Sequence, residues 1–180
     1  AGFVSGTSMA NFCGLAAARF RLLQNQQWDV NEQGLIGAPG IRVVAGREAH
    51  STVLKAISLL GLGKGNIEWV ETDNEGRIMS NQIPELDSRT LLILQAGNVH
   101  SGSFDDLNTI CAKARQAGAW IHIDGAFGLW AGATERMRDS HKDWNTLIRG
   151  LWMRIKHSTL HTTRVYCCVQ TRKPSLLHCT

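Results

Sequence analysis

The sequence has no apolar run long enough to cross a membrane and no stretch with the features of a secretory signal peptide. It also lacks internal repeats, and its 180 residues suffice for one domain or part of one. No zinc-site spacing occurs among its five cysteines, which are Cys13, Cys111, Cys167, Cys168 and Cys179. We therefore expect free thiols, no metal site, no membrane partner and a cytoplasmic location.

Acidic residues are scarcer than basic ones, with 15 Asp and Glu against 19 Lys and Arg. The imbalance is confined to residues 141–180, which contain seven Lys or Arg and one acid. Before that segment the acids outnumber the bases. Because the basic residues do not spread over the body of the chain, we predict no nucleic-acid partner.

Apolar patterning alternates between the strand period and the helix period along most of the chain. It predicts strands over residues 41–45, 67–70, 91–94 and 120–123, a surface loop over 28–40, and helices over 9–24, 51–60, 80–87 and 104–117. Ser103 is the predicted cap of the last helix, with Asp105 and Asp106 in its first turn. Such alternation is typical of an α/β fold with a mostly parallel sheet flanked by helices.

The most informative stretch is GAWIHIDGAFGLWA, residues 118–131, where a buried strand ends on Asp124. Ligand-binding groups of open α/β sheets lie at the carboxyl ends of strands. A buried carboxylate is costly unless a cation meets it, so Asp124 is a candidate partner for a cationic ligand. The alternatives are a helix cap or a structural acid with an ion-pair partner.

A small-residue turn, residues 5–8, leads into the first predicted helix. Free amides and hydroxyls at a helix amino end bind anions, and Gly6 permits a close approach of the backbone to a phosphate. Thr7 and Ser8 are therefore candidate phosphate ligands. Ordinary helix capping by Ser5 or Ser8 is the alternative.

Two further polar residues occupy comparable positions. His50 begins the helix predicted over residues 51–60, where an imidazole suits stacking against an aromatic ring; a capping or merely exposed histidine is the alternative. Asn98 follows the strand predicted over 91–94, beside small residues that leave room near Asp124. It is a candidate ligand-binding residue, and a turn-forming asparagine is the alternative.

Four motifs, FVSGTSMANF, AHSTVLKA, QAGNVHSGSFDDL and WIHIDGAFGLWA, resemble those of the group II pyridoxal-phosphate-dependent decarboxylases. That family includes glutamate and aromatic amino acid decarboxylases of fold type I, and the resemblance covers about residues 1–133. It implies that residues 1–140 are part of the large cofactor-binding domain of an enzyme that releases CO2 from an amino acid. It also implies a pyridoxal 5'-phosphate cofactor and a homodimeric parent protein.

The resemblance gives each candidate residue a place around the cofactor: Thr7 and Ser8 at the phosphate, His50 stacked on the ring, Asn98 in the pocket, Asp124 at the pyridinium nitrogen and Ala126 on the ring's other face. His50 and Asp124 are then the predicted catalytic residues. A protonated ring is an electron sink for the carbanion left by decarboxylation, and a carboxylate at the ring nitrogen keeps it protonated. Another fold type I enzyme, namely an aminotransferase, a cysteine desulfurase or a sphingosine-phosphate lyase, is the alternative, as is a non-catalytic binding domain.

One element of the family pattern is missing. The family carries a lysine about thirty residues after this aspartate, in a stretch resembling Asp-Ala-His-Lys, that holds the cofactor as a Schiff base. The printed sequence has no such stretch, so we expect this chain to be an inactive fragment.

The tail, residues 141–180, suggests a cause, because its composition fits no ordinary segment. Trp152 and Met153 have the single codons TGG and ATG, and reading from the third base of the Trp152 codon gives GAT, which encodes aspartate. With permitted codons for the neighbours, the alternative frame reads VDAHKTLNTPYDSG, which looks like the missing lysine segment. We therefore hypothesise that the tail is translated out of frame.

Overall fold

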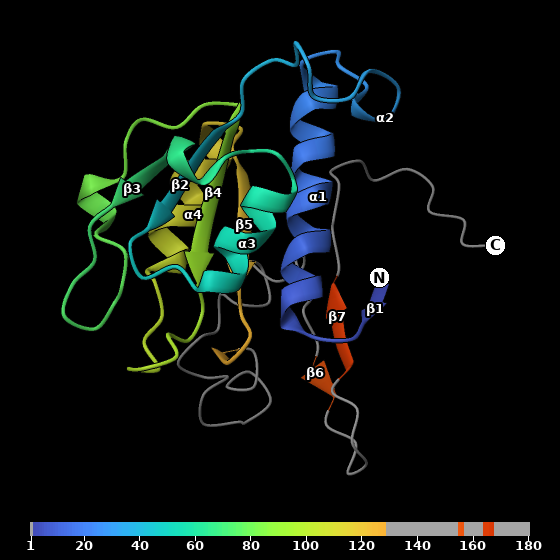
Figure 1. Ribbon diagram of the computed structural model, residues 1–180. Coiled ribbons are helices and arrows are strands. Elements are labelled where there is room, and N and C mark those ends of the chain that lie inside the picture. Colours follow the sequence, from blue (N-terminus) through green and yellow to red (C-terminus); the bar gives the residue numbers. More distant parts are fainter. Residues whose placement is uncertain (1, 129–154, 157–163, 168–180) are drawn as a thin grey trace, which may run out of the picture.

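A four-stranded parallel sheet forms the centre of the computed structural model, which describes residues 2–128, 155–156 and 164–167. The strand order is β3 (Ile67–Val70), β2 (Arg42–Gly46), β4 (Thr90–Gln95) and β5 (Trp120–Asp124), with every neighbouring pair parallel (Figure 1). This arrangement confirms the predicted mostly parallel α/β fold. Each strand was predicted to within one residue at either end.

Helices cover both faces of this sheet. On one face, α1 (Thr7–Asn25) and α3 (Ser51–Leu59) pack their apolar stripes on the side chains of Val43, Leu91 and Ile93. On the other, α4 (Leu107–Gln116) packs on Val44, Leu92 and Leu94. Strand β4 is buried on both faces, as its continuous apolar sequence TLLIL requires. No helix in the described part of the chain is long and apolar enough to cross a membrane.

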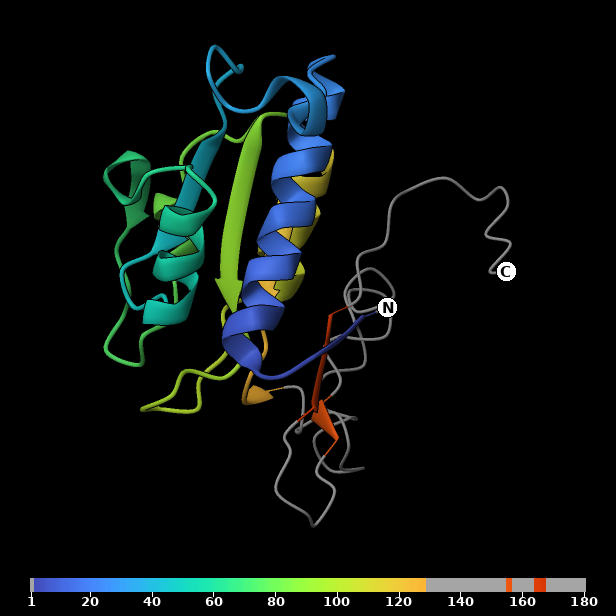
Figure 2. The ribbon, with the colours of Figure 1, turned by 45° about the vertical axis from the view of Figure 1, so that its right-hand side comes forward.

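The carboxyl ends of the strands and the amino end of α1 lie at the same edge of the sheet. Figure 2 shows the first turn of α1 beside the arrowhead of β4, and both views place the end of β5 nearby. Residues 125–128 then turn back toward β4, because the Gly128 amide donates to the Ala96 carbonyl at 2.9 Å. This edge is where the sequence analysis places the candidate ligand-binding residues.

Two helix predictions are wrong in part. Residues 80–87 form only the 3-10 turn η2 (Ser80–Gln82), because Ile83 precedes Pro84 and takes the extended conformation that such a residue favours. The last helix begins at Leu107 rather than residue 104, and its cap is Asp106, not Ser103. Phe104 instead forms a bridge with Ala96 at the end of β4.

The remaining elements are short. The predicted loop over residues 28–40 contains the one-turn helix α2 (Val30–Gln33), and the 3-10 turn η1 (Lys64–Asn66) precedes β3. A separate antiparallel sheet pairs β1 (Gly2–Val4) with β7 (Arg164–Cys167), and β7 with β6 (Ile155–Lys156). The rest of the predicted tail, and the end of the GAWIHIDGAFGLWA motif, lie outside the described residues.

Candidate active site at the carboxyl edge of the sheet

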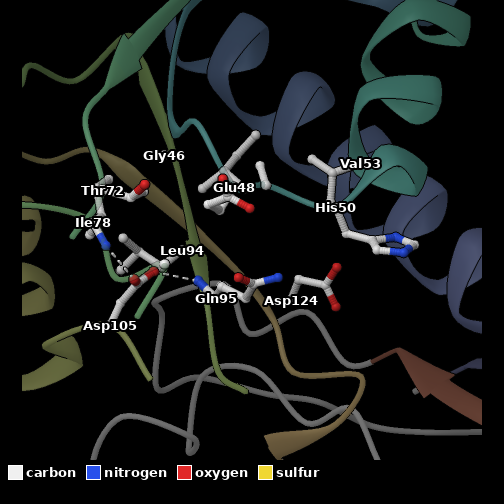
Figure 3. Close-up of a pocket in the computed structure, with 13 residues that line it drawn as sticks. Gly46, Glu48, His50, Val53, Thr72, Ile78, Leu94, Gln95, Asp105 and Asp124 are labelled. Carbon is white, nitrogen blue, oxygen red and sulfur yellow. Dashed lines mark hydrogen bonds between the residues drawn. The ribbon is translucent and has the colours of Figure 1, made fainter. Parts of the chain in front are cut away.

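A hollow of about 310 Å³, part of it open to solvent, lies at the carboxyl edge of the sheet. His50, Gln95, Asp105 and Asp124 are among the residues that line it (Figure 3). His50 comes from the start of α3, Gln95 and Asp124 from the last positions of two adjacent strands. The structure therefore brings together the two predicted catalytic residues, His50 and Asp124, around one cavity.

Asp124 is a buried carboxylate with no cationic partner in the part of the chain that the structure describes. The residue is 5% exposed, and none of the ion pairs among the described residues includes it. Its Oδ2 accepts a hydrogen bond from Asn11 Nδ2 at 3.1 Å, and its Oδ1 accepts one from the Ala126 amide at 3.2 Å. Because neutral donors alone do not cancel a charge, this carboxylate suits a cationic group in the hollow.

Asn11 was not predicted from the sequence, and it lies behind Asp124 without lining the hollow. It is completely buried on α1, where its Nδ2 also contacts Thr52 Oγ1 at 3.2 Å and its Oδ1 contacts His122 Nε2 at 3.0 Å. A signal was present, since Asn11 occupies a position of the apolar stripe that continues through Leu15 and Leu22. A polar residue in such a stripe must find partners inside the protein.

His122 lies two residues before Asp124 and therefore on the same face of β5. It is 1% exposed, and burial lowers its pKa to about 4, although the carboxylate of Asp124 acts in the opposite direction. The imidazole is thus neutral at neutral pH. Its Nε2 faces the Asn11 carbonyl oxygen, which can only accept, so Nε2 carries the hydrogen.

His50 caps α3, as the alternative interpretation of the sequence had it. Its Nδ1 accepts from the Thr52 amide at 3.3 Å and contacts Thr52 Oγ1 at 2.9 Å. These bonds fix the imidazole at the rim of the hollow without using its ring face. Capping and stacking are therefore compatible, and stacking on a ligand stays a prediction.

The amino end of α1 is free of side-chain caps. Gly6 is the cap residue, no side chain bonds to the helix end there, and the first helical bond runs from the Ala10 amide to the Gly6 carbonyl. The interpretation of Ser5 or Ser8 as the cap is therefore wrong. The amides of Thr7 and Ser8 have no partner within the helix, and these residues lie about 4 to 6 Å along the helix axis from Asn11. An anion at this helix end would lie near Asp124.

Asn98 is placed differently from the other candidates. Its Oδ1 accepts hydrogen bonds from the amides of His100 and Ser101 at 2.8 and 3.3 Å, and its Nδ2 donates to Gln95 Oε1 at 3.2 Å. These bonds form the turn after β4 that the alternative interpretation proposed. Of the predicted site residues only His50 and Asp124 line the hollow; Thr7, Ser8, Asn98 and Ala126 do not, and their contact with a ligand stays a prediction.

Asp105 holds the hollow's other wall in place. Its two oxygens accept from the amides of Ile78 and Gln95 at 2.8 and 2.6 Å (Figure 3). Burial raises the pKa of this carboxyl, and the two amide bonds oppose the shift. The sequence analysis assigned Asp105 to the first turn of a helix, so this role was missed.

No lysine lines the hollow within the described residues. Lys156 lies in β6, and Lys142 lies outside the described part of the chain. The structure thus contains the acid and the histidine of the predicted site, and the printed sequence supplies no amine in the expected context.

Fold and site together define an α/β protein with a ligand site at the carboxyl edge of a parallel sheet, built around a buried acid and an uncapped helix end. Residues 2–143 match the family model described as the pyridoxal-dependent decarboxylase conserved domain. The chain therefore belongs to the pyridoxal-dependent decarboxylase family.

Individual relatives agree with this assignment. The chain is 30% identical over 134 residues to the acidic amino acid decarboxylase GADL1 of Mus musculus, covering 70% of this chain and 24% of that protein. It is 28% identical over 138 residues to the cysteine sulfinic acid decarboxylase of Mus musculus, covering 70% and 26%. The crystal structure of mouse CSAD in its apo form superposes with a TM-score of 0.65 at 24% identity, over 77% of this chain and 30% of that one. The structural neighbours show that the chain has the fold of the large domain of these enzymes, and the chain spans about a quarter of the length of these curated relatives.

Proposed function

We propose that residues 2–128 form the acid-bearing part of a pyridoxal 5'-phosphate site in an amino acid decarboxylase. The observation that carries this proposal is Asp124, a buried carboxylate that lines the hollow at the edge of the sheet and has no cationic partner among the described residues. A protonated pyridine nitrogen is a cation of the kind that such a carboxylate lacks. Membership of the family supports the identity of the ligand.

Each predicted residue has a defined task in this proposal. Asp124 holds the proton on the ring nitrogen, His50 covers one face of the ring, and Ala126 lies at the other face. Thr7 and Ser8 bind the phosphate at the amino end of α1, where the helix dipole favours an anion. Asn98 is the residue with the weakest support, because its side chain is engaged in the turn after β4. When bound, the cofactor supplies a ring that accepts the electron pair released as the substrate loses CO2.

We propose that this chain binds the cofactor non-covalently and has no decarboxylase activity by itself. No lysine lines the hollow in the described residues, and residues 141–180 are proposed to be an out-of-frame tail. In the parent protein we propose a homodimer in the cytoplasm, with no membrane or nucleic-acid partner. Its substrate is proposed to be an amino acid, and the named relatives make acidic amino acids the first to assay.

Binding of pyridoxal 5'-phosphate to the purified chain tests the proposal. We expect saturable binding, seen as a change in the absorbance and circular dichroism of the cofactor. Replacing Asp124 by alanine should weaken it at least about tenfold, equivalent to about 1.4 kcal/mol. The matched control is Glu85→Ala, which removes an exposed acid that does not line the hollow. Borohydride treatment followed by mass spectrometry should show no site-specific covalent adduct.

Two outcomes would contradict the proposal. The first is a folded chain that binds no pyridoxal 5'-phosphate. The second is equal affinity in the parent chain and the Asp124→Ala variant, which would mean that the acid does not contact the ring nitrogen.

A further inference from the structure

We propose that Asn11 is a positioning residue for Asp124, and that His122 fixes the direction in which the Asn11 amide points. This inference rests on the proposed cofactor site and extends it to two buried residues behind the acid. Neither lines the hollow, so both would act through Asp124.

The three polar contacts of the Asn11 side chain are favourable in only one orientation of the amide. Nδ2 faces two acceptors, Asp124 Oδ2 at 3.1 Å and Thr52 Oγ1 at 3.2 Å, while Oδ1 faces His122 Nε2 at 3.0 Å. Rotating the amide by half a turn would place its oxygen against the Asp124 carboxylate and its nitrogen against a ring N–H. Both new contacts would be repulsive, because an acceptor would meet an acceptor and a donor a donor.

His122 fixes this orientation of the Asn11 side-chain amide. The ring is buried and neutral, and its Nδ1 has no hydrogen-bond partner among the described residues. A hydrogen on Nδ1 would therefore be left without an acceptor, and Nε2 would face the Asn11 oxygen without a donor. The Nε2–H tautomer avoids both costs. The imidazole thus presents a fixed donor that keeps the Asn11 oxygen on its side and the Asn11 amino group on the side of Asp124.

The result is a carboxylate held from behind by two donors. Asn11 holds Oδ2 and the Ala126 amide holds Oδ1, so the plane of the carboxylate is fixed while Asp124 still lines the hollow. The same amino group reaches Thr52, whose hydroxyl lies 2.9 Å from His50 Nδ1. Since Thr52 Oγ1 accepts from Asn11, its own hydrogen is free to donate to His50. One hydrogen-bonded chain therefore orients both the acid and the histidine that flank the proposed ring site.

The test compares two probes that differ at one ring atom. Pyridoxal 5'-phosphate contains the ring nitrogen, and its 1-deaza analogue has a C–H group there. We expect the parent chain to bind pyridoxal 5'-phosphate at least tenfold more tightly than the analogue. In Asn11→Leu, which has a similar side-chain volume, this preference should fall below about threefold while binding of the analogue changes little. Asn31→Leu, at an exposed asparagine of α2, is the matched control and should keep the full preference.

The outcomes separate this inference from the proposed function. A parent chain that binds both probes equally, or neither, overturns the role of Asp124 and the inference with it. A tenfold preference that persists in Asn11→Leu overturns only the role of Asn11. If Asn11→Leu does not fold, Asn11→Ala, which suits a helix and leaves space, gives the same comparison.

Nitrogen-15 NMR of the parent chain tests His122 independently of any ligand. The long-range imidazole correlations should show hydrogen on Nε2, and His122→Phe should reduce the preference between the two probes as Asn11→Leu does. A hydrogen on Nδ1 would overturn the proposed role of His122.

Discussion

The buried imidazole of His122 makes the stability of the chain depend on pH in a predictable direction. In the folded protein burial lowers its pKa from 6.5 to about 4, whereas in the unfolded chain water restores the ordinary value. Between these two values the unfolded state binds a proton that the folded state does not. Stability is therefore fully present above the unfolded pKa and falls as the pH drops toward the folded one.

The size of the effect follows from the difference between the two pKa values. At 1.36 kcal/mol per pKa unit, a shift from 6.5 to about 4 corresponds to roughly 3 kcal/mol of unfolding free energy. This is a large part of the stability of a small domain, which is typically about 5 to 15 kcal/mol. Asp105 acts in the opposite direction, because its raised pKa removes stability as the pH increases.

Urea unfolding at a series of pH values from about 7 to about 4 measures the effect. The parent chain should lose roughly 3 kcal/mol more than His122→Gln over this range, because Asp105 and the other acids contribute equally to both. His100→Gln, which removes an exposed histidine, should follow the parent. Identical pH dependence in the parent and in His122→Gln would refute the reasoning, as would an NMR titration of His122 near its ordinary pKa.

Three further predictions concern packing, chemistry and coding. Gly128→Ala should cost about 1 to 3 kcal/mol in urea unfolding, since a Cβ there would overlap the Ala96 carbonyl. Gly40→Ala is the control, because a Cβ at Gly40 meets no atom within 4 Å and its backbone is not left-handed. In a full-length relative, replacing the aspartate that matches Asp124 by alanine should reduce turnover far more than cofactor content, and unchanged turnover would refute the assigned role. The coding DNA should read Asp-Ala-His-Lys in the alternative frame across residues 152–156, and a stop codon in that frame would exclude the out-of-frame tail.

The strands and the parallel sheet were predictable because burial on both sides leaves a local mark in the sequence. The runs TLLIL and WIHI are short and mostly apolar, and each is followed by a polar residue, Gln95 or Asp124, so their carboxyl-terminal limits are visible without tertiary information. The start of α4 was not visible in this way. Phe104 and Asp105 have the sequence of a helix start, but a bridge to Ala96 and bonds to Ile78 and Gln95 keep them outside the helix.

The ends of secondary-structure elements revealed Asp124 and His50, because position at a strand end or helix start is itself a functional signal. Asn11 carried no such positional signal. It lies inside a helix, and its bond to Asp124 joins residues 113 positions apart. The one local clue was an asparagine in an apolar stripe, which shows that a partner exists without showing which one. Sequence reasoning therefore found two groups that line the hollow, Asp124 and His50, and missed Asn11, which is bonded to Asp124.

The hydrogen bonds around Asn11 also indicate which part of cofactor binding the chain retains without the Schiff-base lysine. The hydrogen bonds of Asn11 join three elements that all lie within residues 2–128. They connect α1 to α3 through Thr52 and to β5 through His122 and Asp124. A Schiff-base lysine takes no part in holding them. In the proposed site, recognition of the ring nitrogen by Asp124 therefore does not depend on covalent capture of the cofactor by a lysine. A chain with an altered tail whose sheet and helices fold should therefore still recognise the ring nitrogen. It should not capture the cofactor covalently.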